Sequence, residues 1–246
     1  MEGRFFVSIV IIFAAVLLGV PAATTRAWVC DDAFISFRYA QNLVRGHGLV
    51  FNIGEHVEGY TNFLWTVWCA LGMVLGFDVE GWAIFWGIIC CAGTILLLGY
   101  SWFERRKEDA SVLFPFPMGA MSAAVHSEWH VYATGGLGTS LFTFLSFAGY
   151  VLVTRRRYEF SGLVYASAVL TRPDGVLFAA LSGGYILLTE RANLRSALRF
   201  GVPFFCIFIP FTLWRHFYYG DWYPNTYYAK SADLSWYAQG WRFVRL

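Results

Sequence analysis

The stretch that follows the first hydrophobic segment of the chain reads Asp31-Asp32-Ala33-Phe34-Ile35-Ser36-Phe37-Arg38-Tyr39-Ala40. The segment before it, Phe5–Ala23, is apolar except for Ser8 and is long enough to cross a bilayer as a helix. Two adjacent carboxylates where a helix leaves the lipid are costly, and such charges usually serve a pathway, a proton relay or an active site. The polar and aromatic loop that they open, which runs to Asn62, is therefore predicted to roof a reaction chamber at the membrane surface.

The composition indicates an integral membrane protein. The hydrophobic fraction is 58% and the charged fraction is 14%, against about 25% charged residues in a soluble globular domain. Apolar segments recur along the whole chain, so no soluble domain is left to hold a core. The formal net charge of +2, with basic residues spread along the chain, argues against a nucleic-acid partner.

Basic residues predict the topology, because cytoplasmic loops carry an excess of Lys and Arg. Four clusters lie beside apolar segments: Arg4, Arg105-Arg106-Lys107, Arg155-Arg156-Arg157, and Arg191 with Arg195 and Arg199. Placing them inside, with a cytoplasmic amino terminus, predicts about seven transmembrane helices: Phe5–Ala23, Trp82–Phe103, Ala110–Val125, Ser140–Thr154, Tyr158–Thr171, Gly175–Thr189 and Phe200–Tyr218.

The segment Phe63–Phe77 is short for a span, and its Trp65 and Trp68 suit a membrane interface. We therefore expect an interfacial or re-entrant helix on the outer side. The chain is predicted to be one all-α polytopic domain. It divides into a first helix (5–23), which a signal peptidase could also remove, an outer loop with interfacial helices (24–81), helices two to seven (82–218) and an outer segment (219–246).

Several motifs resemble, in the same order, a known group of membrane enzymes. Besides Asp31–Ala40, they read Gly-His-Gly-Leu-Val-Phe-Asn at 46–52, Val-Glu-Gly-Tyr-Thr-Asn-Phe-Leu-Trp at 57–65, Ala-Thr-Gly-Gly-Leu at 133–137, Leu-Thr-Arg-Pro-Asp-Gly at 170–175 and Pro-Asn-Thr-Tyr-Tyr-Ala-Lys at 224–230. They resemble the GT-C class of glycosyltransferases related to the mycobacterial terminal arabinofuranosyltransferase. Two positions depart from that pattern: Gly138 stands where Glu is usual, and Ile53 stands where Pro is usual.

The resemblance implies a GT-C-like bundle with a large first outer loop, in the inner (plasma) membrane and with its active site on the outer, periplasmic face. It implies transfer of a sugar, such as arabinofuranose, from a polyprenyl-phosphate donor to a glycan or lipid acceptor, usually with inversion. Proteins of that group are longer. The chain is thus expected to be the amino-terminal portion of such an enzyme, as a fragment or as one half of a split gene with a separate carboxy-terminal half as partner.

Inverting transfer needs a base that takes the proton of the acceptor hydroxyl. We predict that Asp31 and Asp32 are catalytic: two like charges push their proton affinities apart, so one stays basic while the other orients the substrate or binds a divalent cation. No other cofactor is expected. Arg172 and Lys230 are predicted to bind the donor phosphate. The remaining predicted substrate-binding residues are Arg38, His47, Asn52, Glu58, Tyr60, Asn62, Asp174 and Asn225.

Other interpretations stay open. Asp31 and Asp32 could cap a helix start, and the Arg172 segment could be only a turn, because Pro and Gly favour turns. A transporter or flippase would also be polytopic, but neither mid-depth charges nor internal repeats are visible. A non-catalytic remnant of the enzyme is the third alternative.

Overall fold

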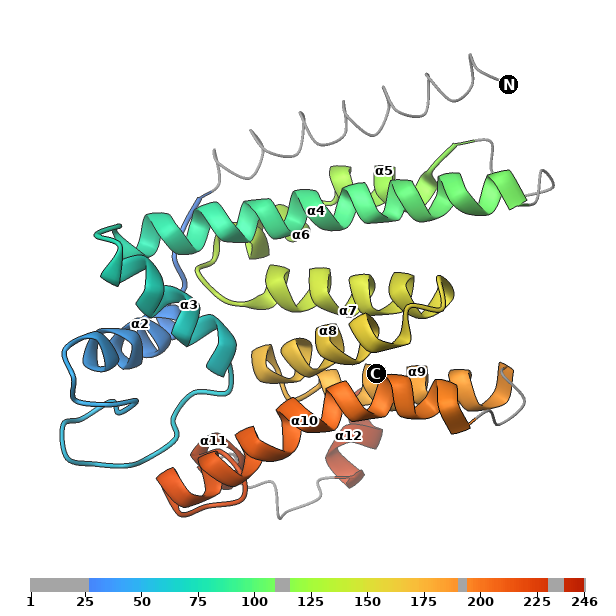
Figure 1. Cartoon of the computed structure of the whole chain (residues 1–246). Coiled ribbons are helices and arrows are strands. Elements are labelled where there is room, and N and C mark those ends of the chain that lie inside the picture. The colour runs from blue at the N-terminus through green and yellow to red at the C-terminus, as the bar shows by residue number, and fades with distance from the viewer. Residues whose placement is uncertain (1–26, 109–115, 190–193, 230–236, 246) are drawn as a thin grey trace.

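The computed structural model describes residues 27–108, 116–189, 194–229 and 237–245. Within these ranges the fold is all-α, as predicted, with no strand. Five helices run side by side and form the bundle in Figure 1: α4 (Val79–Glu108), α7 (Thr139–Thr154), α8 (Tyr158–Thr171), α9 (Gly175–Thr189) and α10 (Leu194–Tyr219).

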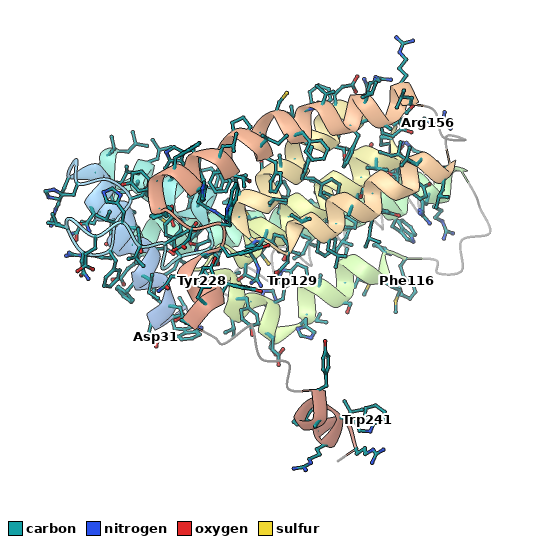
Figure 2. The ribbon with its side chains drawn as sticks, turned by 90° about the horizontal axis from the view of Figure 1, so that it is seen from below. Asp31, Phe116, Trp129, Arg156, Tyr228 and Trp241 are labelled. Carbon is teal, nitrogen blue, oxygen red and sulfur yellow. The ribbon has the colours of Figure 1, made fainter. Side chains whose placement is uncertain are left out.

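The remaining helices are short. α5 (Met118–Val125) and α6 (Ser127–Thr134) pack against α4. At one end of the bundle lie α2 (Asp31–Val44), α3 (Phe63–Val74) and α11 (Asn225–Ala229) (Figure 1). Helix α12 (Tyr237–Val244) stands apart from the bundle in Figure 2.

Two helices of the described part, α4 and α10, are long and apolar enough to cross a membrane. The pair α6 and α7, bent by 113°, adds a third span if it is counted as one. α8 and α9 have 14 and 15 residues. At about 1.5 Å per residue, neither reaches across a hydrocarbon core of about 30 Å. The predicted count of seven spans is therefore not confirmed, and Phe5–Ala23 lies outside the described residues.

The predicted helix Ala110–Val125 differs most from its expectation. Its described part contains only α5, which begins after Pro117 and ends, as predicted, at Val125. The backbone of His126 is extended, with φ −76° and ψ 109°, so α5 and α6 are separate helices. Eight residues give a helix of only about 12 Å, which is too short for a span.

The predicted outer loop 24–81 is largely helical where it is described. α2 and α3 account for much of it and pack against each other through Ala33, Phe37 and Ala40 on one side and Trp65 and Cys69 on the other. α3 has 12 residues, which agrees with the prediction that its segment does not span. The non-helical part of this region is the connection 45–62 and the short ends on either side.

The two ends of the bundle differ in charge. The end of α4 with Arg105 to Lys107, the α7–α8 turn with Arg155 to Arg157 and the start of α10 lie at one end (Figure 1). The α6–α7 and α8–α9 turns, the end of α10 and helices α2, α3 and α11 lie at the other. Figure 2 shows Arg156 and Asp31 at these opposite ends. The basic clusters and the motifs with the predicted site residues, which alternate along the sequence, thus lie at opposite ends of one bundle.

Candidate functional site

A cavity of about 470 Å³ lies at the end of the bundle opposite the basic clusters. Four separate segments line it, and three of them carry motifs noted in the sequence. They are the loop before α3 with the first residue of that helix (Glu58, Thr61, Phe63), the α8–α9 region (Val169, Leu170, Pro173, Val176), α10 (Phe208, Phe211, Thr212, Arg215) and the segment after α10 (Trp222, Tyr223, Pro224). We call it the Glu58 pocket.

A carboxylate and a guanidinium face each other in this pocket. Glu58 is only 6% exposed, and its Oε2 lies 3.6 Å from Nε of Arg215. Neither of these two atoms has a hydrogen-bond partner among the described residues. Arg215 also donates from Nη2 to the backbone oxygen of Trp222. The backbone oxygen of Glu58 accepts from the Asn225 amide at 2.9 Å. Glu58 thus connects the first loop with α10 and the start of α11.

Burial determines the protonation of this acid. Removal from water disfavours the charged form and raises the pKa of the Glu58 carboxyl to about 7, although the nearby Arg215 lowers it in part. A carboxyl with this pKa exists in both protonation states near neutral pH. A buried acid in a cavity, with such a pKa and a specific charged partner, has the features of a functional site.

The predicted catalytic acids lie at the start of α2. Asp31 and Asp32 occupy its first turn and are exposed, where the positive end of the helix dipole favours negative charge. The N-cap residue is Cys30, so neither acid caps the helix in the usual sense. Asp31 Oδ1 accepts from the Asp32 amide at 3.0 Å and from Cys30 Sγ at 3.3 Å.

The possible metal-ligand atoms of Cys30, Asp31 and Asp32 all lie within 4.8 Å of one another. We call Asp31 and Asp32 the α2 acids. Carboxylate oxygens suit Mg²⁺, Ca²⁺ and Mn²⁺, whereas a Cys sulfur is a soft ligand. A divalent cation would therefore be held by Asp31 and Asp32 rather than by Cys30. The exposure of both acids makes this a weak site by itself, and a cation there stays a proposal.

The α6–α7 turn anchors the start of α2. The Cys30 amide donates to the Gly135 oxygen at 3.0 Å, and Trp65 Nε1 donates to the Gly136 oxygen at 2.9 Å. Gly136 has φ +77°, and a Cβ there would lie 2.9 Å from Cβ of Ala33. The Ala-Thr-Gly-Gly-Leu motif thus contacts both α2 and α3. A Cβ at Gly138 would lie 3.1 Å from Trp65, so the position where Glu is usual in the resembled family is closely packed here.

Arg172 begins the α8–α9 turn, which confirms the turn interpretation of its segment. Its Nη2 and Nε lie 2.8 and 3.2 Å from Oδ2 of Asp174, and both side chains are exposed. The guanidinium also lies over the ring of Phe142, 5.5 Å from the ring centroid. The next residue, Pro173, lines the Glu58 pocket. A turn and a cationic binding group are thus compatible at this position.

Phe142, which lies under the Arg172 guanidinium, also lines a second, more apolar groove. This groove has a volume of about 610 Å³ and lies between α7, α8 and α9. Its lining residues are Phe142, Thr143, Ser146, Phe147, Tyr150, Val153, Tyr165, Phe178, Leu181, Ser182 and Tyr185. The hydroxyls of Ser182 and Tyr165 bond to each other at 2.8 Å, so these two polar groups are satisfied. The groove offers apolar surface along the bundle, and Arg172 lies over Phe142, one of the rings that line it.

The other predicted site residues fall into two groups. Arg38 lies in α2 and donates to the Phe51 oxygen at 3.2 Å. His47 and Asn52 lie in the connection 45–62, where Asn52 donates to Glu55 at 2.9 Å. Arg38 therefore connects α2 with the loop that follows it.

The second group is held inside the fold. Tyr60 is buried, and its hydroxyl lies 3.2 Å from that of Tyr219. Asn62 exchanges hydrogen bonds with Ser36 and so connects α2 with the start of α3. Packing alone explains both residues. Lys230 lies outside the described residues.

Arg215 was missed at the sequence level, together with Trp222. The available signal was a basic residue near the end of an otherwise apolar helix, since charges in such helices usually have a function. The sequence does not show which acid meets it, because Glu58 lies in a distant segment.

No family model matches the chain, and no solved structure matches it. Two curated proteins are similar to it, and both are named terminal β-(1→2)-arabinofuranosyltransferase. The protein of Corynebacterium glutamicum is 28% identical over 252 residues, covering 91% of this chain and 36% of the relative. The protein of Mycobacterium tuberculosis is 28% identical over 237 residues, covering 89% of this chain and 37% of the relative. The chain thus spans little more than a third of the length of these relatives, and the similarity confirms the predicted resemblance.

Proposed function

We propose that this protein acts as a membrane glycosyltransferase that moves a sugar from a polyprenyl-phosphate donor to a glycan or lipid acceptor. Arabinofuranose is the first candidate for that sugar. The observation that carries the proposal is the convergence of three motif segments on the Glu58 pocket, at the end of the bundle that holds the α2 acids. The names of the two similar proteins support a transferase rather than a transporter.

The donor phosphate is assigned to Arg172. Its guanidinium has five donors, of which the two nitrogens Nε and Nη2 bond to Asp174, and its exposure leaves the others accessible. The isoprenoid chain is assigned to the apolar groove between α7, α8 and α9, because Phe142 belongs to that groove and also lies under Arg172. A lipid phosphate has this same order of groups, with an anion at the end of a long apolar chain.

The transfer step is assigned to the α2 acids. The acceptor hydroxyl oxygen forms a bond to the anomeric carbon while its proton passes to Asp31 or Asp32. The bond between the anomeric carbon and the phosphate oxygen breaks, and its electron pair leaves with the polyprenyl phosphate. Attack from the face opposite the leaving group inverts the anomeric carbon. No step in this sequence needs an oxidant or a reductant.

The membrane orientation follows from the charge of the two ends. The basic clusters are assigned to the cytoplasm by the positive-inside rule. The α2 acids, Arg172 and the Glu58 pocket then face the outer side of the plasma membrane, where a polyprenyl-phosphate sugar and a cell-envelope acceptor would meet.

Transfer from a radiolabelled polyprenyl-phosphate arabinofuranose, in membranes that contain the protein, tests the proposal. We expect Asp31→Asn and Asp32→Asn to lower turnover, with a loss of about 10²–10⁴-fold for the residue that is the base, while donor binding stays unchanged. Asp78→Asn is the matched control, because Asp78 Oδ2 caps the start of α4 and Asn caps a helix equally well. If both α2 variants transfer at the parent rate, the base lies elsewhere.

A further inference from the structure

We propose that the Glu58 pocket is a subsite for a neutral sugar ring, whose hydroxyls bond to the Glu58 carboxylate and the Arg215 guanidinium between the aromatic rings that line the pocket. The inference rests on the proposed function, because it names the part of the substrate that this pocket receives. The ring belongs either to the donor or to the acceptor, and the two sources share the same chemistry.

Unused hydrogen-bonding capacity points to a ligand. Glu58 Oε2 and Arg215 Nε are both buried and lack a hydrogen-bond partner within the part of the chain that the structure describes. Their separation of 3.6 Å is long for a hydrogen bond. Buried polar groups in folded proteins almost always have a partner. A ligand that can both donate and accept would satisfy the two atoms together, and a sugar hydroxyl does both.

Charge selects a neutral ligand. When Glu58 is ionised, its carboxylate and the Arg215 guanidinium cancel, and no further charged side chain lines the pocket among the described residues. A phosphate placed here would face the Glu58 carboxylate, and desolvated like charges repel strongly. At the neighbouring turn, Arg172 is exposed, and the carboxylate beside it, Asp174, is exposed to water as well. A phosphate bound to Arg172 would therefore not face a buried carboxylate. The phosphate and the sugar of one donor molecule would therefore occupy adjacent positions with different electrostatics.

The lining and size of the pocket also suit a sugar. Phe63, Trp222 and Tyr223 contribute aromatic faces, on which the apolar C–H face of a sugar can rest. The Trp222 ring stacks on His216 with centroids 3.9 Å apart and planes 11° apart, which holds its orientation. The volume of about 470 Å³ lies within the range of about 300–1,000 Å³ that is usual for small-ligand sites.

Saturation-transfer NMR with methyl arabinofuranoside, on the purified protein in lipid nanodiscs, tests this subsite. We expect the parent to bind the glycoside and Glu58→Gln to bind it about 10-fold more weakly, because a hydrogen bond to a charged group is lost. Glu55→Gln is the matched control: it is the same substitution three residues earlier, at an exposed acid. Arg215→Lys gives a second variant should Glu58→Gln fold poorly, and circular dichroism checks each one.

No saturation transfer to the parent, or equal affinity in Glu58→Gln and Glu55→Gln, would overturn the inference. Binding of polyprenyl phosphate, measured on the same samples, reports on the proposed function separately: if it persists while the glycoside fails to bind, only the sugar subsite is lost. In the transfer assay, a higher KM for the donor in Glu58→Gln assigns the ring to the donor, and a higher KM for the acceptor assigns it to the acceptor. Unchanged values of both would also contradict the subsite.

Discussion

At the scale of single residues, burial gives Glu58 a chemistry that its residue type alone does not. Asp31 and Asp32, by contrast, are exposed in the first turn of α2. Glu58 is already desolvated beside Arg215, and its pKa near 7 follows from that position. In the function we propose, the α2 acids act on the acceptor hydroxyl, whereas Glu58 binds the sugar ring in the pocket.

The raised pKa of Glu58 predicts a pH dependence of stability. The pKa of the Glu58 carboxyl is about 7 in the folded protein, whereas its ordinary pKa, which applies to the unfolded chain, is 4.5. The folded state therefore binds more protons in between, and stability falls as pH rises from about 4.5 to about 7. Glu58→Gln should remove this loss, which is about 3 kcal/mol.

Thermal melting of detergent-purified protein at pH 5 and pH 8 measures the effect. The melting temperature of the parent should fall more between the two values than that of Glu58→Gln, and Glu55→Gln should behave like the parent. An identical pH response of the parent and Glu58→Gln would show that Glu58 does not hold a proton near neutral pH.

At the scale of secondary-structure elements, close helix approaches hold the bundle together. A Cβ at Gly162 of α8 would overlap the Phe200 backbone oxygen of α10. The absence of a side chain allows this contact, and Tyr165, Phe200 and Phe204 pack around it. Small residues have this role in membrane bundles, where interhelical packing replaces the hydrophobic effect.

Gly162→Ala should therefore destabilise the protein by about 2 kcal/mol or more, because the α8 and α10 backbones must separate. Gly184→Ala in α9 is the matched control, since a Cβ there meets nothing within 4 Å, and Ala favours a helix over Gly by up to about 1 kcal/mol. Thermal melting of both variants makes the comparison. Equal melting temperatures would mean that α8 and α10 do not approach this closely.

The α6–α7 turn gives a second prediction. Gly136→Ala should lower the stability for two reasons: Ala is strained in the left-handed conformation at φ +77°, and its Cβ would collide with Ala33. Gly46→Ala, at φ +80° and with open space around it, should lower the stability only through the backbone strain. The conformational part is about 1–2 kcal/mol, so Gly136→Ala should be the more destabilising by at least about 1 kcal/mol. A Gly46→Ala variant that melts as low as Gly136→Ala would indicate that the turn does not contact α2.

Local signals explain which elements could be predicted from the sequence. The bounds of α8 and α9 agree with the prediction, because an Arg cluster and a Pro-Asp-Gly turn mark their ends. α10 begins at Leu194 and not at Phe200, because Arg195 and Arg199 are helical while the hydrophobic run starts after them.

Interactions between distant segments could not be predicted in this way. Glu58 was one of several polar residues in the first loop, and its sequence neighbours do not indicate burial. The ion pair with Arg215 depends on how α10 packs beside the first loop. The end of α5 at Val125 agrees with the prediction. Helix α6 was not predicted, because Ser127–Thr134 includes Glu128 and His130 and contains no long apolar run.

At the scale of the whole molecule, we predict that the two ends of the bundle lie on opposite sides of the membrane. Single cysteines replacing Arg172 and Arg156, in a background without the five native cysteines, report this with an impermeant thiol reagent. In intact cells, position 172 should react and position 156 should react only after permeabilisation. Labelling at 156 but not at 172 would reverse the orientation and place the Glu58 pocket in the cytoplasm.

The proposed function requires that this bundle hold a polyprenyl-phosphate sugar with its phosphate at Arg172. Equilibrium binding of labelled polyprenyl-phosphate arabinofuranose to the protein in nanodiscs measures it most directly. We predict saturable binding by the parent, a loss of about 10- to 100-fold in Arg172→Ala because a charged hydrogen bond is removed, and parent-like affinity in Arg156→Ala at the opposite end of the bundle. Binding that is equally strong in Arg172→Ala and Arg156→Ala, or that does not saturate in the parent, would contradict the account.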